Sequence, residues 1–129
     1  MQLDDWTVLG EVLAPYVPYL MVAWEKNRLG VYDPANPRDS NAVLAGWSAR
    51  AKAAELNSWE ALAAYLAIAW VARSAGADPT WLGALGILWL ASRGAYLAAY
   101  VSGRGQLRIW TWFAGVALLL ARAALAIAA

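Results

Sequence analysis

Apolar residues fall into long stretches that short polar segments separate. These stretches cover residues 6–24, 56–72, 81–101 and 109–129. Each is close to the roughly 20 residues that a helix needs to cross a bilayer core about 30 Å thick. The pattern therefore predicts an all-α integral membrane four-helix bundle, formed by one domain over residues 1–129.

Proline and glycine indicate where the first two helices bend and end. Pro15 and Pro18 predict a kink in the first stretch, which membrane helices tolerate when neighbouring helices satisfy the freed carbonyls. The segment "EKNRLGVYDPANPRDSNAVLAG" (residues 25–46) is dense in Pro, Gly, Asn and Asp and predicts a loop. We expect the second helix to begin in water near residues 40–42 and to enter the membrane around Leu56.

The other connections are short. "SAGADPT" (residues 74–80) predicts a tight turn, with Pro79 starting the third helix. "SGRGQLR" (residues 102–108) predicts a second short turn before the last helix.

Composition narrows the function classes. Hydrophobic residues make up 62% of the chain, which is well above the fraction usual in soluble domains. The net charge of +1 argues against a nucleic-acid surface, which needs a concentrated basic patch. Cysteine and histidine are absent, so disulfides, thiolate nucleophiles, imidazole bases and the usual zinc ligands are excluded.

Most basic residues lie in two of the connections. These are Lys26, Arg28, Arg38, Arg50, Lys52, Arg104 and Arg108. The positive-inside rule places both connections in the cytoplasm and both termini on the non-cytoplasmic side. Asp4 and Asp5 replace the basic start of a signal peptide, so we expect the first helix to be retained.

One face of the second helix is polar at membrane depth. In "RAKAAELNSWE", Arg50, Ala53, Asn57 and Glu60 have helical spacing and share a face about three turns long. A charged side chain near the centre of a span costs roughly 2.5 to 3.5 kcal/mol on insertion scales. Glu60 therefore needs a partner or a water-filled cleft.

The third and fourth stretches offer matching polar groups. "SRGAYLAAY" places Arg93, Tyr96 and Tyr100 on one face, and we expect Arg93 to pair with Glu60. Arg108 lies at the cytoplasmic mouth of the last span, where its guanidinium would reach an anionic ligand. Arg122 lies deeper and is expected to reach the far interface or to pair between subunits.

Each of these residues also has a structural explanation. A Glu60–Arg93 pair would lock two helices together, and Tyr96 and Tyr100 would be ordinary interfacial aromatics. Arg50 and Arg108 would be solvated positive-inside charges. Their combination is less easily explained in this way.

"RAKAAELNSWE", followed by "RGAYLAAYVSGRGQLR", resembles the MAPEG family, the membrane-associated proteins in eicosanoid and glutathione metabolism. The hallmark that carries the resemblance is an Arg-Ala start, then an Asn and, three residues on, a Glu. Here these are Arg50, Ala51, Asn57 and Glu60. The resemblance extends over about residues 5–127 and suggests a bacterial-type member of the inner membrane.

The resemblance implies a homotrimer that binds glutathione between neighbouring subunits near the cytoplasmic face. It implies that Asn57 and Glu60 contact glutathione, while Arg93 holds Glu60 and faces the ligand. Tyr96 matches a position that holds an aromatic residue or His in relatives, Tyr100 matches a Tyr that lines the glutathione pocket, and both are expected to bind glutathione. Arg108 matches the arginine that stabilises the glutathione thiolate, because a nearby cation favours S⁻ over SH. The other substrate would be a lipophilic small molecule from the lipid bilayer.

Two positions depart from the family pattern. An arginine that clamps a glutathione carboxylate in the eicosanoid enzymes is replaced here by Ala53, and Lys52 or Arg50 would have to substitute. Glu55 stands where a His is common, and it opposes anion binding unless it faces Arg50 or Lys52.

Two functions of different classes remain open. One is a membrane glutathione transferase or glutathione-dependent peroxidase acting on lipophilic electrophiles, with Arg108 as the catalytic residue. The other is a noncatalytic MAPEG-like structural or accessory subunit of a larger membrane complex. A small transporter is disfavoured because the sequence shows no continuous polar path through the spans.

Overall fold

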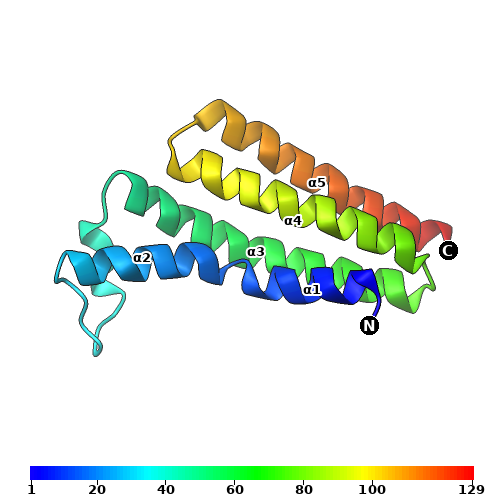
Figure 1. Cartoon of the computed structure of the whole chain (residues 1–129), viewed down its shortest axis with the longest axis horizontal. Coiled ribbons are helices and arrows are strands. Elements are labelled where there is room, and N and C mark those ends of the chain that lie inside the picture. The colour runs from blue at the N-terminus through cyan, green and yellow to red at the C-terminus, as the bar shows by residue number, and fades with distance from the viewer.

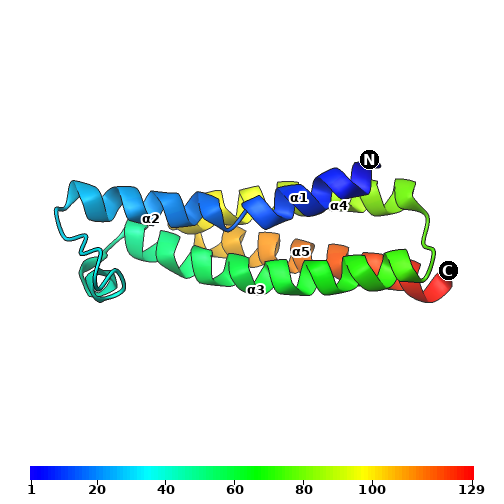
Figure 2. The same ribbon diagram turned by 90° about the horizontal axis from the view of Figure 1, so that it is seen from below.

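The computed structural model covers residues 1–129, and every element in it is helical (Figure 1). In chain order these elements are α1 (Leu3–Leu13), α2 (Tyr16–Arg28), the 3-10 helix η1 (Asp39–Val43), α3 (Trp47–Ser74), α4 (Pro79–Val101) and α5 (Gly105–Ala128). Since α1 and α2 follow one another along one line, the long helices form a bundle of four rods, as Figures 1 and 2 show. The predicted all-α bundle is confirmed.

Three of the four rods are long and apolar enough to cross a membrane. They are Leu3–Arg28, which combines α1 and α2, together with α4 and α5. Helix α3 contains the expected span over residues 56–72 and is less apolar, because Asn57 and Glu60 lie within it. Many large hydrophobic side chains face outward, as expected for a surface in lipid, including Trp70 at 72% and Leu120 at 65% exposure.

Two helix starts differ from the sequence expectation. Helix α3 begins at Trp47, not near residues 40–42, because Gly46 adopts a positive φ of 57° just before it. Residues 39–43 form the short η1 turn instead. Helix α5 begins at Gly105, so the turn expected over residues 102–108 is shorter and leaves Arg108 inside the helix.

The start of α4 agrees with the prediction. Pro79 occupies the first turn, where its missing N–H costs no hydrogen bond. The Asp78 side chain caps the helix by accepting from the backbone N–H groups of Thr80 at 2.7 Å and Trp81 at 3.3 Å. This cap holds the third long helix in register with its turn.

The proline break divides the packing of the first rod. Helix α1 packs on α4, whereas α2, on the other side of Pro15, packs on α3. Proline supplies no N–H donor, so the ladder is interrupted at Pro15 and Pro18. One chain segment thereby contacts two different neighbours.

Small residues let α1 approach α4 closely. A Cβ placed on Gly83 would lie 2.8 Å from the Cβ of Leu3. A Cβ on Gly86 would collide with the side chain of Thr7. Glycine at these two positions is therefore required by the close contact between the helices.

The two ends of the bundle carry different charges. The termini and the α3–α4 turn lie at one end, and the α2–α3 loop and the α4–α5 turn lie at the other (Figures 1 and 2). The basic residues of the two connections named above therefore gather at the same end. We refer to it as the basic end and to the opposite one as the terminal end.

Arg122 is fully buried near the terminal end, which corrects the expectation that it reaches an interface or another subunit. Its guanidinium donates to the Asp4 carboxylate at 2.9 Å and to the Leu82 carbonyl at 2.5 Å. It also lies over the Tyr65 ring, 4.6 Å from the centroid. Arg73 reaches the same Asp4 carboxylate at 2.7 Å, so α1, α3, α4 and α5 meet in this network.

Candidate functional site

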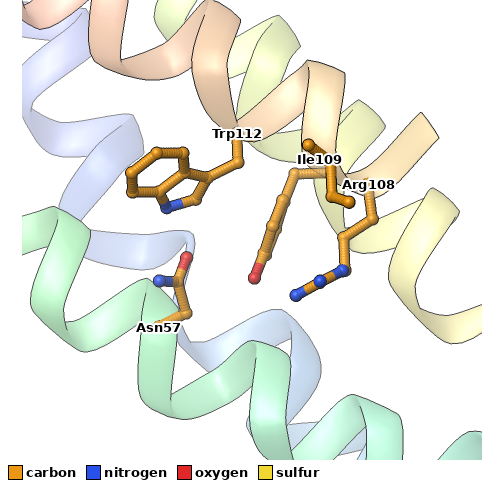
Figure 3. Close-up of a pocket in the computed structure, with 5 residues that line it drawn as sticks. Asn57, Arg108, Ile109 and Trp112 are labelled. Atoms are coloured by element: carbon orange, nitrogen blue, oxygen red, sulfur yellow. The ribbon is translucent and has the colours of Figure 1, made fainter. Parts of the chain in front are cut away.

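A cavity of about 210 Å³ opens between α3, α4 and α5. Its lining consists of Asn57, Tyr96, Arg108, Ile109 and Trp112. Figure 3 shows Asn57 on α3 facing Trp112, Ile109 and Arg108, which project from α5. Three residues predicted from the sequence therefore meet at one cavity.

Arg93 connects α4 to this cavity through Asn57. Its guanidinium donates to the Asn57 side-chain carbonyl at 2.9 Å. With its oxygen held in this way, Asn57 keeps its amide NH₂ group for another acceptor. Arg93 itself is 8% exposed and lies behind the lining rather than in it.

The expected ion pair between Glu60 and Arg93 is not formed. Glu60 is exposed on the outer surface of the chain and makes no salt bridge, while Arg93 points inward to Asn57. The two residues Asn57 and Glu60 are about 60° apart around the helix, and only Asn57 turns toward α4. A shared helical face was too broad a criterion to predict which of the two residues contacts Arg93.

Two arginines enclose a pair of tyrosines. Arg93 lies 4.5 Å from the ring centroid of Tyr96, and Arg108 lies 4.8 Å from that of Tyr100. The two rings contact each other edge to face, with centroids 5.6 Å apart. Cation–π contacts of this kind hold each guanidinium over a ring face and leave its N–H edge free to donate.

Arg50 lies outside the cavity. Its guanidinium donates twice to the carbonyl of Val101, at 3.1 and 2.9 Å, and so caps the C-terminus of α4. The family hallmark residue thus makes a structural contact in this chain. Its role in glutathione binding stays a prediction.

Glu55 faces Lys52, which is the arrangement in which we expected it not to oppose anion binding. The Lys52 ammonium donates to both Glu55 carboxylate oxygens at 2.9 Å. Both residues line a separate cavity of about 560 Å³ between α2, α3 and the intervening loop. The negative charge of Glu55 is therefore neutralised outside the Asn57 cavity.

The cavity lining has one cation and no carboxylate. Arg108 takes part in no salt bridge, so its charge is available to a ligand. Beside it, the Asn57 amide offers a neutral donor, and Ile109 and Trp112 offer an apolar wall. This arrangement suits an anionic, partly peptide-like molecule next to an apolar one.

Sequence reasoning missed three residues near the site. Ile109 lies in the apolar stretch like any other residue, and Trp112 has the position of an interfacial aromatic, so neither carried a signal. Glu11 is different, because it is an ionisable residue inside the first apolar stretch, where such residues are functional hypotheses by default.

Comparison with known proteins gives one family and no individual relative. No curated protein matches the chain. The MAPEG family model matches residues 6–128, which is nearly the whole sequence. Together with the three helices apolar enough to span a membrane, this match establishes that the chain is an integral membrane protein and a member of the MAPEG family.

Proposed function

We propose that the protein is a membrane-embedded glutathione transferase or glutathione-dependent peroxidase that acts on lipophilic electrophiles. MAPEG membership indicates glutathione-related or eicosanoid chemistry in general. The observation that carries the specific proposal is the cavity where Asn57, Tyr96 and Arg108 meet at the basic end. These residues come from three helices, and the resemblance to the family implies a role at the glutathione site for each of them.

The residues present fit glutathione by their chemistry. The ligand carries two carboxylates and a thiol, and the lining supplies one cation and an amide without any carboxylate. Tyr96 lines the cavity, and Tyr100 packs behind it edge to face, with an arginine over each ring. Glutathione would lie with its sulfur toward Arg108.

The proposed reaction uses the thiolate as nucleophile. Arg108 favours loss of the thiol proton to water because its positive charge stabilises S⁻. In the transferase reaction the sulfur forms a bond to the electrophilic carbon while the leaving group departs with its electron pair. Ile109 and Trp112 would hold the lipophilic partner beside the sulfur, so that proximity lowers the barrier.

A second copy of the chain would complete this site. The cavity of about 210 Å³ is smaller than the roughly 300 to 1,000 Å³ usual for ligand pockets. Glu60 is exposed on the outer surface, although a charged group facing lipid is costly. A homotrimer would solve both problems by covering Glu60 and adding walls to the cavity.

The proposed setting is a bacterial inner membrane with the basic end in the cytoplasm. Lysine and arginine near span ends favour the cytoplasmic side, and the terminal end would then face outward. The cavity at the basic end would draw on cytoplasmic glutathione. Its electrophile would arrive from the bilayer.

The test is calorimetric titration of glutathione into the detergent-purified protein, with conjugation of a chlorinated nitrobenzene followed in parallel. We expect saturable binding by the wild type at millimolar or lower glutathione. R108A should reduce conjugation at least about a hundredfold, in line with loss of a charge-stabilising group in other enzymes. R104A removes a cation from the neighbouring turn outside the cavity and should leave both measurements unchanged.

Two results would overturn the proposal. A folded wild type that binds no glutathione would favour the accessory-subunit function, and proteins that co-purify with it would then be identified. Equal activity loss in R104A and R108A would show that general surface charge, and not Arg108, is responsible.

A further inference from the structure

Glu11 is a buried carboxylate without a hydrogen-bond partner. The buried face of α1 consists of Asp4, Thr7 and Glu11. Asp4 pairs with arginines, and Thr7 hydrogen-bonds to the Tyr65 hydroxyl at 2.8 Å. Glu11 is 1% exposed, and neither of its carboxylate oxygens has a partner. It is therefore the unexplained member of this face.

Two groups on α4 stand next to Glu11. One is Trp89, which is 2% exposed and whose indole N–H also lacks a partner. The other is Arg93, which lies about one helical turn beyond Leu90, the α4 residue whose side chain would be 2.9 Å from a Cβ placed on Gly10, next to Glu11. Trp89 and Arg93 are four residues apart, so they lie one above the other on the same face of α4. Arg93 also contacts the Trp89 ring, 5.7 Å from its centroid.

Charge balance explains this arrangement. Arg93 is buried and forms no salt bridge, and Glu11 is buried and forms none. An isolated charge in such surroundings is strongly unfavourable, whereas two opposite charges on facing helices partly compensate each other even without a direct ion pair. On the buried faces of α1 and α4, Glu11 and Arg93 are the charged residues that lie outside the Asp4 network.

We propose that Glu11 is a positioning residue of the candidate glutathione site, acting through Arg93 on Asn57. The charge on α1 orients the guanidinium on α4 without a direct ion pair, and that guanidinium donates to the Asn57 carbonyl on α3. The orientation of the Asn57 amide in the cavity thus depends on a residue of the first helix. This inference rests on the proposed function for its ligand.

A neutral residue at position 11 would leave Arg93 and Asn57 without a fixed orientation. In E11Q, the negative charge that orients Arg93 is lost. The Arg93 guanidinium then no longer keeps the Asn57 amide turned toward the cavity. We expect the dissociation constant for glutathione to rise about tenfold, since a hydrogen bond to a charged group is lost or misdirected. The KM for the lipophilic electrophile should not change, because Ile109 and Trp112 are untouched.

The experiment compares E11Q, E11D and D5N by calorimetric titration of glutathione. E11D retains the charge and should recover most of the affinity. D5N neutralises a partly exposed carboxylate on the same helix, at the terminal end, and should bind like the wild type. Wild-type affinity in E11Q, or an equal loss in D5N, would overturn the positioning role.

A second measurement needs no glutathione. The melting temperatures of E11Q, R93Q and E11Q/R93Q form a double-mutant cycle. We expect the double variant to be clearly less destabilised than the sum of the single ones, because it removes both buried charges together. Additive shifts would show that the two charges are not coupled and would overturn the inference.

The two measurements separate this inference from the proposed function. If the wild type binds no glutathione, the proposed function fails and Glu11 loses its role in that site, whatever the cycle shows. If the wild type binds and E11Q binds equally well, the proposed function stands and only the positioning role fails.

Discussion

At the scale of single residues, two groups of buried charges differ in how they are paired. Asp4 and Arg122 belong to an ion-pair network at the terminal end, where both Asp4 carboxylate oxygens pair with an arginine. Glu11 and Arg93 lie farther along the bundle and share no direct ion pair. The first network pairs both oxygens of its buried carboxylate, whereas in the second group both Glu11 oxygens lack a partner.

Removing Arg122 should destabilise the protein strongly. R122M leaves Asp4 buried beside Arg73 alone and removes the cation over Tyr65. Breaking a buried pair from one side costs about 3 to 5 kcal/mol, so we expect a large drop in melting temperature in detergent. The matched variant D4N/R122M removes both charges and should melt above R122M. A wild-type melting temperature for R122M would contradict the role of the network.

At the scale of elements, glycine decides how closely α1 and α4 approach each other. A methyl group on Gly86 has no room beside Thr7, whereas one on Gly94, on the same helix, meets nothing within 4 Å. G86A should therefore cost about 1 to 3 kcal/mol through overpacking. G94A should be neutral or slightly stabilising, because alanine favours helix more than glycine does. Equal melting temperatures for the two variants would show that the helices separate at no cost.

The cap of α4 should make stability depend on acid pH. Hydrogen bonds from the backbone N–H groups of Thr80 and then Trp81 hold the pKa of the Asp78 carboxyl below its ordinary value of 3.8. A carboxyl with a lowered pKa in the folded state stabilises the protein above its ordinary pKa. This contribution is lost as the pH falls through the lower, folded pKa.

The variant D78N isolates this effect. Asparagine still caps a helix but does not titrate in this range. We expect the melting temperature of the wild type to fall more steeply between pH 5 and about pH 2 than that of D78N, as measured by circular dichroism in detergent. Parallel curves for the two proteins would show that the Asp78 cap contributes nothing to the acid dependence.

At the scale of the whole molecule, Glu60 is the feature that a single chain cannot accommodate in a bilayer. It is exposed, unpaired and set in the less apolar rod α3. We expect native mass spectrometry from mild detergent to show a trimer, and E60A to shift it toward monomer by removing a contact between copies. E60A in an unchanged trimer would show that Glu60 is not part of the interface. A monomeric wild type would remove the homotrimer from the proposal.

The pattern of apolar and charged residues was sufficient to predict the number of rods, their approximate bounds and the segregation of charge between the two ends. These properties follow from composition along the chain, because about 20 apolar residues must cross the bilayer and basic residues gather in connections. Local chemistry also sufficed for the start of α4, since Asp78 and Pro79 form a cap from neighbouring residues. The motif at Asn57 and Glu60 could also be recognised from the sequence, because its members lie within one short stretch.

Only the tertiary structure decided which of these residues act together. Arg93 contacts Asn57 and not Glu60, and Arg122 pairs with Asp4 across 118 residues of sequence. Helical spacing restricts a side chain to a broad face, but the partner is chosen by which helix packs there and how closely. That choice depends on the break at Pro15 and on Gly83 and Gly86, which together bring the buried Glu11 against α4. The role of a buried charge is therefore a property of the packed bundle and cannot be read from the sequence around it.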